Sequence, residues 1–230
     1  MRNVAASRLI PLPACGERVP DRAGEGHVPP LETIGLRVLA IGAGLLLWFI
    51  TQKMIGARTL PDGALYDHLH VVTGGWNRWL HEHPRAANAV LVASSLAVDA
   101  VTLFVLARAV FGPSFMPFFG LLALFLLRQV AQAAVALPPP PGIIWRDPGV
   151  PSLFVTYGVG NDFFFSGHTA LAVYGAMQLA AIGIPALGIA GIVVAVLQIV
   201  AVIALRAHWT MDVIAGLAAA IAVGVLFQPG

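Results

Sequence analysis

The stretch SGHTALAVYGAMQLAAIGIPALGIAGIVVAVLQIVAVIALRAHWTMD, residues 166–212, has polar residues at its two ends and few between them. His168 and His208 lie about 40 residues apart, and a helix of that length rises about 60 Å at about 1.5 Å per residue. That rise equals two crossings of a hydrocarbon core about 30 Å thick. Gly183 and Pro185 mark a tight turn halfway along. The stretch therefore predicts a helical hairpin in a membrane that returns both histidines to one face.

The composition of the whole chain indicates an integral membrane protein. Its 230 residues are 58% hydrophobic and 10% charged, and the mean hydropathy is +0.84. A water-soluble domain cannot cover its surface with so few polar residues. Cys15 is the single cysteine, which excludes a framework of intramolecular disulfides. The net charge of +2 is too small to indicate a nucleic-acid partner.

Six segments are long and apolar enough to cross a bilayer as helices. They cover residues 33–54, 86–111, 114–136, 166–183, 185–205 and 209–227. We therefore expect an all-α fold in one domain, residues 33–230, built as a six-transmembrane-helix bundle, with a flexible N-terminal tail over residues 1–32. An even number of crossings places both termini on one side and the three longer polar connections on the other. Lys and Arg divide almost equally between the two sides, so the positive-inside rule leaves the absolute orientation open.

An interfacial amphipathic helix is expected in the first polar connection, residues 55–85. Its large apolar residues recur at spacings of three and four: Leu65, Leu69, Val72, Trp76 and Trp79. That periodicity is typical of a helix with one apolar face, and tryptophan is common at the membrane interface. We interpret this helix as a cover at the headgroup level rather than as part of the chemistry.

His168, His208 and Asp212 are the candidate catalytic residues. Asp212 follows His208 by four residues, so one helical turn places its carboxylate beside the imidazole, where it can fix the tautomer and stabilise a positive charge. Three interpretations are open at this point. The first is phosphoryl transfer with one histidine as nucleophile and the other as general acid. The second is a zinc site, and the third is a structural role at helix ends, which the cost of ionisable groups at membrane depth argues against.

Ser166 and Gly167 favour a phosphate over a metal cation. They open the helix that begins at residue 166, and backbone amides at a helix N-terminus bind anions. Ser166 is equally suited to be an ordinary N-cap. Arg128 and Arg206 are the candidate cations for the phosphate oxygens. Asp99, in the middle of the second apolar segment, is expected to pair with Arg128 or another polar group, with a proton path as the alternative.

Two motifs carry a family resemblance. The stretches DFFFSGHTA at 162–170 and HWTMDVIAG at 208–216 resemble the signature motifs of the sphingomyelin synthase family, a branch of the type 2 phosphatidic acid phosphatase superfamily of six-helix membrane enzymes. Upstream, LPDGALYDHL at 60–69 and LRQVAQAAVALPPPPG at 127–142 are similar to the family's segment after helix one and to its third helix. The resemblance covers about residues 35–227.

The resemblance implies a phosphotransferase that acts on lipid headgroups without a metal or other cofactor. It implies that His208 attacks phosphorus, that Asp212 supports it, and that His168 protonates the diacylglycerol leaving oxygen. The candidates for binding the phosphate and headgroup are then Ser166, Gly167, Arg128, Arg206 and Asp162. The implied partners are a glycerophospholipid donor of phosphocholine or phosphoethanolamine and a lipid alcohol acceptor such as ceramide. The implied site lies at the membrane face opposite the termini, and the oligomeric state is left open.

Two other functions fit the same residues. A lipid phosphatase or a phospholipase C-like hydrolase would use the same two histidines and aspartate with water as the acceptor. The exclusion of water and the seating of the acceptor decide between transfer and hydrolysis. Outside enzymes, a lipid transporter would bind a headgroup at the polar rim without cleaving it. The sequence has no broken mid-helix segments and no paired repeats in its two halves, which argues against the transporter.

Overall fold

The computed structural model describes residues 29–56, 65–155, 157 and 163–227. These residues form eight helices and no strand: α1 (Leu31–Gly56), α2 (His68–Val72), α3 (Gly74–Glu82), α4 (Pro84–Phe111), α5 (Met116–Ala134), α6 (Gly167–Ala180), α7 (Pro185–Ala204) and α8 (Thr210–Leu226). The all-α prediction is confirmed for the described part of the chain. Four of the helices, α1, α4, α5 and α7, are long and apolar enough to cross a membrane, as expected of an integral membrane protein.

The count of six membrane-spanning helices is not confirmed. All six predicted segments contain a helix, but α6 has 14 residues and α8 has 17. At about 1.5 Å per residue α6 rises about 21 Å, which is less than a hydrocarbon core of about 30 Å. The helix expected over 166–183 ends early because a turn leads from Ala181 to the first proline of α7.

The expected interfacial helix forms as two short helices, α2 and α3, separated at Thr73. Their place relative to a bilayer stays a prediction. The expected N-terminal tail lies outside the described residues apart from its last four, and α1 begins within them at Leu31.

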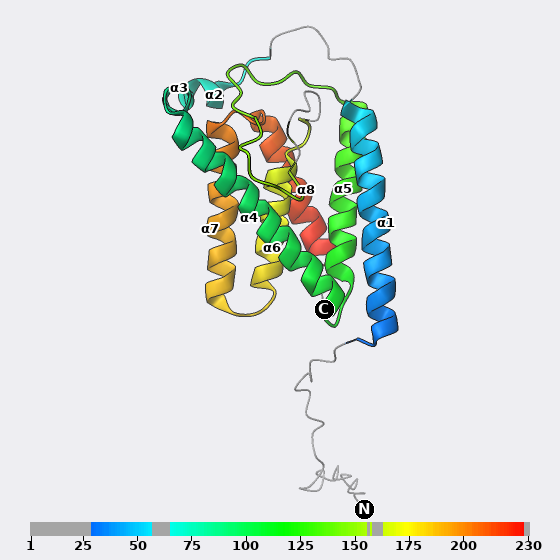
Figure 1. Ribbon diagram of the computed structural model, residues 1–230. Helices are drawn as coiled ribbons and strands as arrows, with labels where there is room; N and C mark the ends of the chain where they lie inside the picture. The colour runs from blue at the N-terminus through cyan, green and yellow to red at the C-terminus, as the bar shows by residue number, and fades with distance from the viewer. Residues whose placement is uncertain (1–28, 57–64, 156, 158–162, 228–230) are drawn as a thin grey trace, which may run out of the picture.

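Helix α6 lies at the centre of the bundle. It packs against α4, α5, α7 and α8, and α1 packs on the outside of α4 and α5 (Figure 1). The α2 and α3 helices and the link between α7 and α8 lie together at one end of the bundle, which is the top in Figure 1. The turn between α6 and α7 and the start of α1 lie at the other end. The fold therefore gathers the polar connections at one end.

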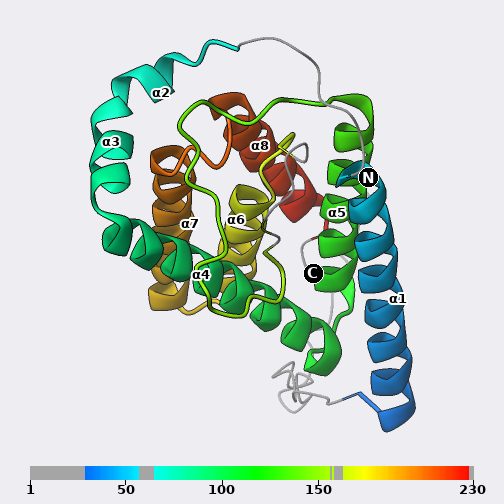
Figure 2. The same ribbon diagram turned by 45° about the horizontal axis from the view of Figure 1, so that its top comes forward.

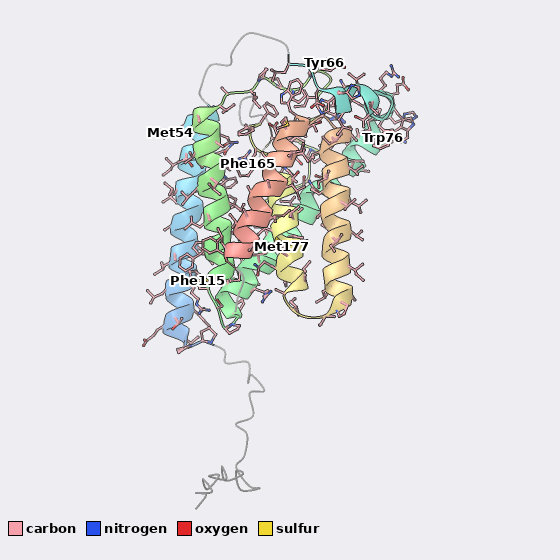
Figure 3. The ribbon with its side chains drawn as sticks, turned by 180° about the vertical axis from the view of Figure 1, so that it is seen from behind. Met54, Tyr66, Trp76, Phe115, Phe165 and Met177 are labelled. Carbon is pink, nitrogen blue, oxygen red and sulfur yellow. The ribbon has the colours of Figure 1, made fainter. Side chains whose placement is uncertain are left out.

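Small residues let the neighbours of α6 approach closely. A Cβ at Gly175 would collide with Val101 of α4, and one at Gly224 of α8 would collide with Met177 (Figure 3). A Cβ at Gly216 of α8 would lie 2.6 Å from the carbonyl oxygen of Ser166. Close backbone approach at small residues is how helices pack in membranes, where burial in lipid provides little driving force. These contacts fix the start of α6 against the first turns of α8.

The connection between α5 and α6 folds back across α4 before it reaches α6 (Figure 2). Asp99 of α4 holds it. The carboxylate accepts hydrogen bonds from Ser152 Oγ at 3.1 Å and from the backbone N–H groups of Leu153 and Phe154 at 2.9 and 3.0 Å. Non-helical backbone inside a membrane bundle must find partners for its polar groups. Asp99 therefore pairs with this connection, which answers the question that the sequence left open.

Candidate active site

His168 and His208 face the same cavity. His168 is the second residue of α6, and His208 lies in the link 205–209 that joins α7 to α8. Their ring centroids are 6.2 Å apart, and both side chains line a cavity of about 50 Å³. The α6–α7 hairpin brings them together, since the chain leaves the rim at one histidine and returns to it at the other. The cavity wall is otherwise mainly apolar and aromatic, with Trp48, Phe125 and Trp145 among its residues.

The backbone carbonyl of Phe163 fixes the tautomer of His208. Nδ1 of His208 lies 3.0 Å from that oxygen, and a carbonyl can only accept a hydrogen bond. Nδ1 therefore carries the hydrogen, and Nε2 carries the lone pair of the neutral ring. The sequence had assigned this orienting role to Asp212, whose Oδ2 lies 3.7 Å from Nδ1, beyond hydrogen-bonding distance. The carboxylate is close enough to stabilise a positive charge on the ring.

Asp212 joins the first turn of α8 to the start of α6. Its Oδ2 accepts the backbone N–H of Trp209 at 3.0 Å, and its own carbonyl accepts the N–H of Ser166, also at 3.0 Å. The side chain is fully buried. Its Oδ1, and likewise Nε2 of His168, is buried without a hydrogen-bond partner among the described residues. Buried polar atoms of this kind are uncommon and call for an explanation such as a ligand, water or ion.

Ser166 is the N-cap of α6. Its Oγ accepts the backbone N–H of Thr169 at 3.3 Å and the Thr169 hydroxyl at 3.1 Å. Because its own amide is bonded to Asp212, that amide is not available for the phosphate that the sequence assigned to it. Gly167 does line the cavity, and a Cβ there would lie 3.1 Å from Nε of Arg128. The glycine thus leaves room for a cation against the helix start.

Arg128 of α5 also lines the cavity. Its Nε donates to the carbonyl of Phe165 at 3.0 Å, and Nη1 lies 3.4 Å from Oε1 of Gln52 on α1. These contacts hold the guanidinium beside the start of α6 and the two histidines. The structure therefore brings together His168, His208, Asp212, Gly167 and Arg128, while the predicted site residue Asp162 lies outside the described residues.

Arg206 is not among the residues that line this cavity. Its Nη1 donates to the carbonyl of Pro141 at 2.6 Å, and Nη2 donates to that of His70 at 3.0 Å. Its backbone is left-handed, with φ of 51°. Amide hydrogen bonds from residue 206 to Ile203 and from residue 207 to Val202 end α7 in a Schellman pattern, which usually has glycine at this position. The sequence named Arg206 as a candidate cation for the phosphate oxygens, but in the structure its guanidinium contacts these two backbone carbonyls instead of lining the cavity.

The zinc alternative finds no ligand set in the described part of the chain. No group of three or more His, Cys, Asp or Glu side chains there is arranged to hold a metal ion.

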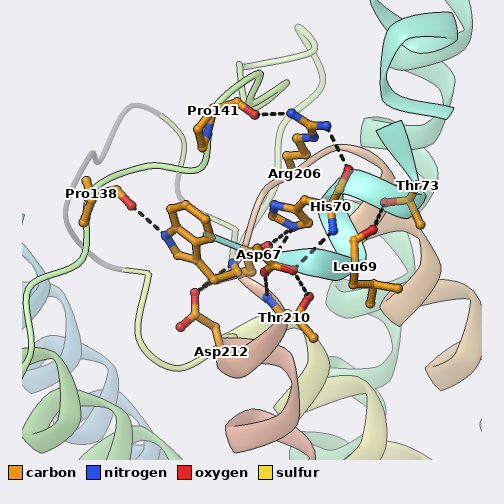
Figure 4. A network of polar contacts seen from close by, with 11 residues as sticks. Asp67, Leu69, His70, Thr73, Pro138, Pro141, Arg206, Thr210 and Asp212 are labelled. Carbon is orange, nitrogen blue, oxygen red and sulfur yellow. Dashed lines mark hydrogen bonds and ion pairs between the residues drawn. The ribbon is translucent and has the colours of Figure 1, made fainter. Parts of the chain in front are cut away.

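His70 of α2 and the N-cap residue Asp67 contact the same link and the start of α8, and both were missed by the sequence reasoning (Figure 4). Asp67 bonds Thr210, and His70 bonds the backbone of His208. Burial lowers the pKa of His70, and the nearby positive charge of Arg206 lowers it further against the opposing effect of Asp67. The available signal was the run YDHLH at 66–70, which places an aspartate and two histidines inside a segment interpreted only as a cover at the headgroup level.

The sequence model of the AtPDCT1/2 family matches residues 66–228, which is more than half of the chain. The chain belongs to the AtPDCT1/2 family. This is a family of phosphatidylcholine:diacylglycerol cholinephosphotransferases, and membership supports a membrane phosphotransferase enzyme in general. Comparison with curated proteins and with solved structures gives no match.

Membership of the AtPDCT1/2 family overturns the assignment to the sphingomyelin synthases, a related but different family. The correction has a chemical reason. The motifs around His168 and His208 contain residue types that headgroup transfer needs whatever the acceptor is. These motifs therefore do not identify the acceptor. Ceramide as the acceptor therefore has no support from the family match.

Proposed function

We propose that this member of the AtPDCT1/2 family transfers phosphocholine from phosphatidylcholine to diacylglycerol through a phosphohistidine at His208. The observation that carries the proposal is the pair of imidazoles in one cavity, 6.2 Å apart, with Nδ1 of His208 donating to a carbonyl. That arrangement leaves Nε2 of one ring as a nucleophile and places a second ring where it can transfer a proton. The family match supports the choice of both lipids.

In the first half-reaction, Nε2 of His208 attacks the phosphorus of phosphatidylcholine. The new bond is N–P, and the bond that breaks joins phosphorus to the glycerol oxygen. His168, protonated when the anionic phosphodiester is bound, gives its proton to that oxygen, and diacylglycerol leaves. The products are neutral His168 and phosphocholine bound to His208. The positive charge that develops on His208 lies near the carboxylate of Asp212, at 3.7 Å from Nδ1.

In the second half-reaction, the hydroxyl of another diacylglycerol takes the place of the first. His168 accepts its proton as the oxygen attacks phosphorus, and the N–P bond to His208 breaks. A new phosphatidylcholine forms, and both histidines return to their starting states. The second half-reaction is the reverse of the first with a different diacylglycerol, so one site serves both.

The other residues at the cavity either stabilise the negative charge of the phosphate or form the wall around the substrate. Arg128 provides a positive charge for the phosphate oxygens, and the backbone at Gly167 lies at the positive end of the α6 dipole. Ser166 holds the start of α6 in place as its N-cap. Aromatic and apolar residues of α1, α4 and α5 complete the wall, as a substrate with acyl chains requires. We place this site at the membrane face opposite the termini.

The test uses purified protein in vesicles that contain phosphatidylcholine with an isotope-labelled headgroup and diacylglycerol of a different chain length. Mass spectrometry of the lipids should show the label on phosphatidylcholine that carries the chains of the added diacylglycerol. His208→Ala protein should give no such product. Label that appears only as free phosphocholine would make the protein a hydrolase, and labelled product with His208→Ala would overturn the nucleophile.

A further inference from the structure

The link that carries His208 is held from outside by α2. Nε2 of His70 lies 3.1 Å from the backbone carbonyl of His208 and donates to it, since the carbonyl can only accept. The His70 ring stacks on Trp209, with centroids 5.7 Å apart and an interplanar angle of 18°. His70 is buried and is not one of the residues that line the cavity. It therefore contacts the chain of the proposed nucleophile without reaching the reacting atoms.

Asp67 ties the start of α2 to the start of α8. Its Oδ2 accepts the backbone N–H of Thr210 at 2.7 Å, and its Oδ1 accepts the Thr210 hydroxyl at 2.8 Å (Figure 4). The same side chain caps α2 by accepting the N–H of His70 at 3.2 Å. A carboxylate at the first amide of a helix satisfies a group that has no partner within the helix and interacts favourably with the helix dipole.

Arg206 closes this set of contacts. Arg206 lies two residues before His208 in the chain, and its guanidinium donates to the backbone carbonyl of His70. The His70 ring in turn donates to the backbone carbonyl of His208. The link and the first residue of α8 thus meet α2 and its N-cap at three places: Arg206 through its side chain, His208 through its backbone, and Thr210 through backbone and side chain. Three anchors over five residues leave the backbone of His208 little freedom to rotate.

We propose that Asp67 and His70 are positioning residues that hold the backbone of His208 so that its ring faces His168. The inference rests on the proposed role of His208 as nucleophile. In-line attack on phosphorus requires the nitrogen to lie close to the phosphorus and opposite the leaving oxygen. A misplacement of about 1 Å in such a geometry can lower the rate about 100-fold. Substrate binding depends on the cavity wall, which neither residue joins, so their loss acts on kcat and not on KM.

The experiment compares two substitutions of one residue with a matched control. In His70→Phe the ring can still stack on Trp209, but the donor to His208 is gone. In His70→Gln an amide N–H can replace that donor. The control is His68→Phe, on the same helix, because His68 is exposed and its ring contacts the hydroxyl of Tyr66. Each protein is assayed for headgroup transfer in vesicles over a range of phosphatidylcholine concentrations, with the melting temperature measured in parallel.

The expected result is a kcat lowered about 10- to 100-fold in His70→Phe with KM within about twofold of the wild type. His70→Gln should recover most of kcat, and His68→Phe should match the wild type. Asp67→Asn removes one of the two acceptors for Thr210 and should lower kcat about tenfold with KM unchanged. If His70→Phe does not fold, Asp67→Asn tests the same inference.

The outcomes separate this inference from the proposed function. If His208→Ala abolishes transfer but His70→Phe and Asp67→Asn keep the kcat of His68→Phe, the positioning role is wrong and the nucleophile stands. A raised KM with unchanged kcat, or a loss of activity that only follows the loss of folded protein, would also overturn the positioning role. If the wild type transfers no phosphocholine, or does so without His208, the proposed function itself fails.

Discussion

The cavity between the two histidines and the α2 contacts both involve the link that carries His208, but only the first of them is an open space. At α2, both carboxylate oxygens of Asp67 accept hydrogen bonds from protein donors. Nε2 of His168 in the cavity and Oδ1 of Asp212 beside it are buried with no such partner in the described residues, and the same holds on the α2 side for Nδ1 of His70 and Nε of Arg206. Leaving a buried polar atom unpaired costs about 1–3 kcal/mol. Both regions bear this cost, so the distinguishing feature is the cavity itself. An open space lined by two imidazoles suits a ligand. The carbonyl, amide and ring contacts on the α2 side suit a fixed support.

Burial and a bond to a backbone carbonyl do not by themselves distinguish the proposed nucleophile, His208, from the proposed positioning residue, His70. His70 and His208 are both buried, at 4% and 6% exposure, and both have one ring nitrogen on a backbone carbonyl. They differ in what surrounds the remaining nitrogen. The His208 ring lines a cavity beside a second imidazole, whereas the His70 ring lies against Trp209.

The largest effect is expected on the cavity side, from His208→Gln. Without the imidazole there is no nucleophile, so headgroup transfer should fall by at least about 1000-fold. The melting temperature should change little, because the glutamine amide can still donate to the Phe163 carbonyl. His83→Gln serves as the control for an exposed histidine outside the cavity and should retain full activity. A His208→Gln protein with more than a tenth of wild-type transfer would contradict this contrast.

Gly216→Ala tests the packing that places the two regions relative to each other. The added Cβ would lie 2.6 Å from the carbonyl of Ser166, so α8 and the start of α6 must move apart. We expect a loss of about 1–3 kcal/mol in the free energy of unfolding and a roughly tenfold loss of transfer. Gly42→Ala on α1 is the matched control, since a Cβ there meets nothing within 4 Å. Equal stability of the two variants in denaturant titrations would show that the contact is unimportant.

Two substitutions of Arg206 sharpen the account of the α2 side. Arg206→Ala loses both carbonyl contacts and keeps a side chain on left-handed backbone. Arg206→Gly loses the same contacts but relieves the backbone strain, which is worth about 1 kcal/mol. The glycine variant should therefore be the more stable of the two by about 1 kcal/mol, although both should be less stable than the wild type. Thermal melts of the three proteins measure this, and an alanine variant that is the more stable would refute it.

The smallest effect expected is the dependence of stability on pH. Burial lowers the pKa of His70 below its ordinary value of 6.5, so the unfolded chain takes up this proton at a higher pH than the folded chain does. The contribution of His70 to stability is thus fully present above about pH 6.5 and declines as the pH falls below it. Melting temperatures at pH 7.5 and 5.5 should show a larger decrease for the wild type than for His70→Gln. Equal decreases would exclude this titration.

Asp67 gives a separate test at lower pH. Burial alone would raise its pKa, but hydrogen bonds from Thr210 and His70 outweigh this and bring it below the ordinary 3.8. Its contribution to stability is therefore present above about pH 3.8 and is lost below that value.

The meeting of His168 and His208 could be predicted from the sequence, because it follows from helix rise and membrane thickness. The all-α fold could also be predicted, because the composition indicates a membrane protein and the apolar segments are long enough to cross a bilayer as helices. A structural pairing was expected for Asp99, but its partners could not be predicted, since two of them are backbone amides of a connection with no periodic pattern. Arg206 was assigned to phosphate by its closeness to His208 in the chain, but a left-handed residue at the end of α7 turns its side chain toward Pro141 and His70.

The α2 contacts were missed for another reason. The apolar spacing in residues 65–79 indicated an interfacial helix that covers the bundle at the headgroup level, and that interpretation gave Asp67 and His70 no partner. Their partners lie about 140 residues further along the chain, at the link that carries His208. Periodicity reports which face of a helix is apolar, but it carries no information on which distant backbone groups that helix will meet.

The most direct measurement of the central claim is the isolation of the covalent intermediate. Protein in vesicles of phosphatidylcholine without added diacylglycerol is quenched rapidly, digested under conditions that preserve phosphoramidates, and analysed by mass spectrometry. The account predicts phosphocholine on the peptide that contains His208, and none in His208→Gln protein. Phosphocholine on His168, or full transfer activity with no histidine adduct at any time point, would contradict it.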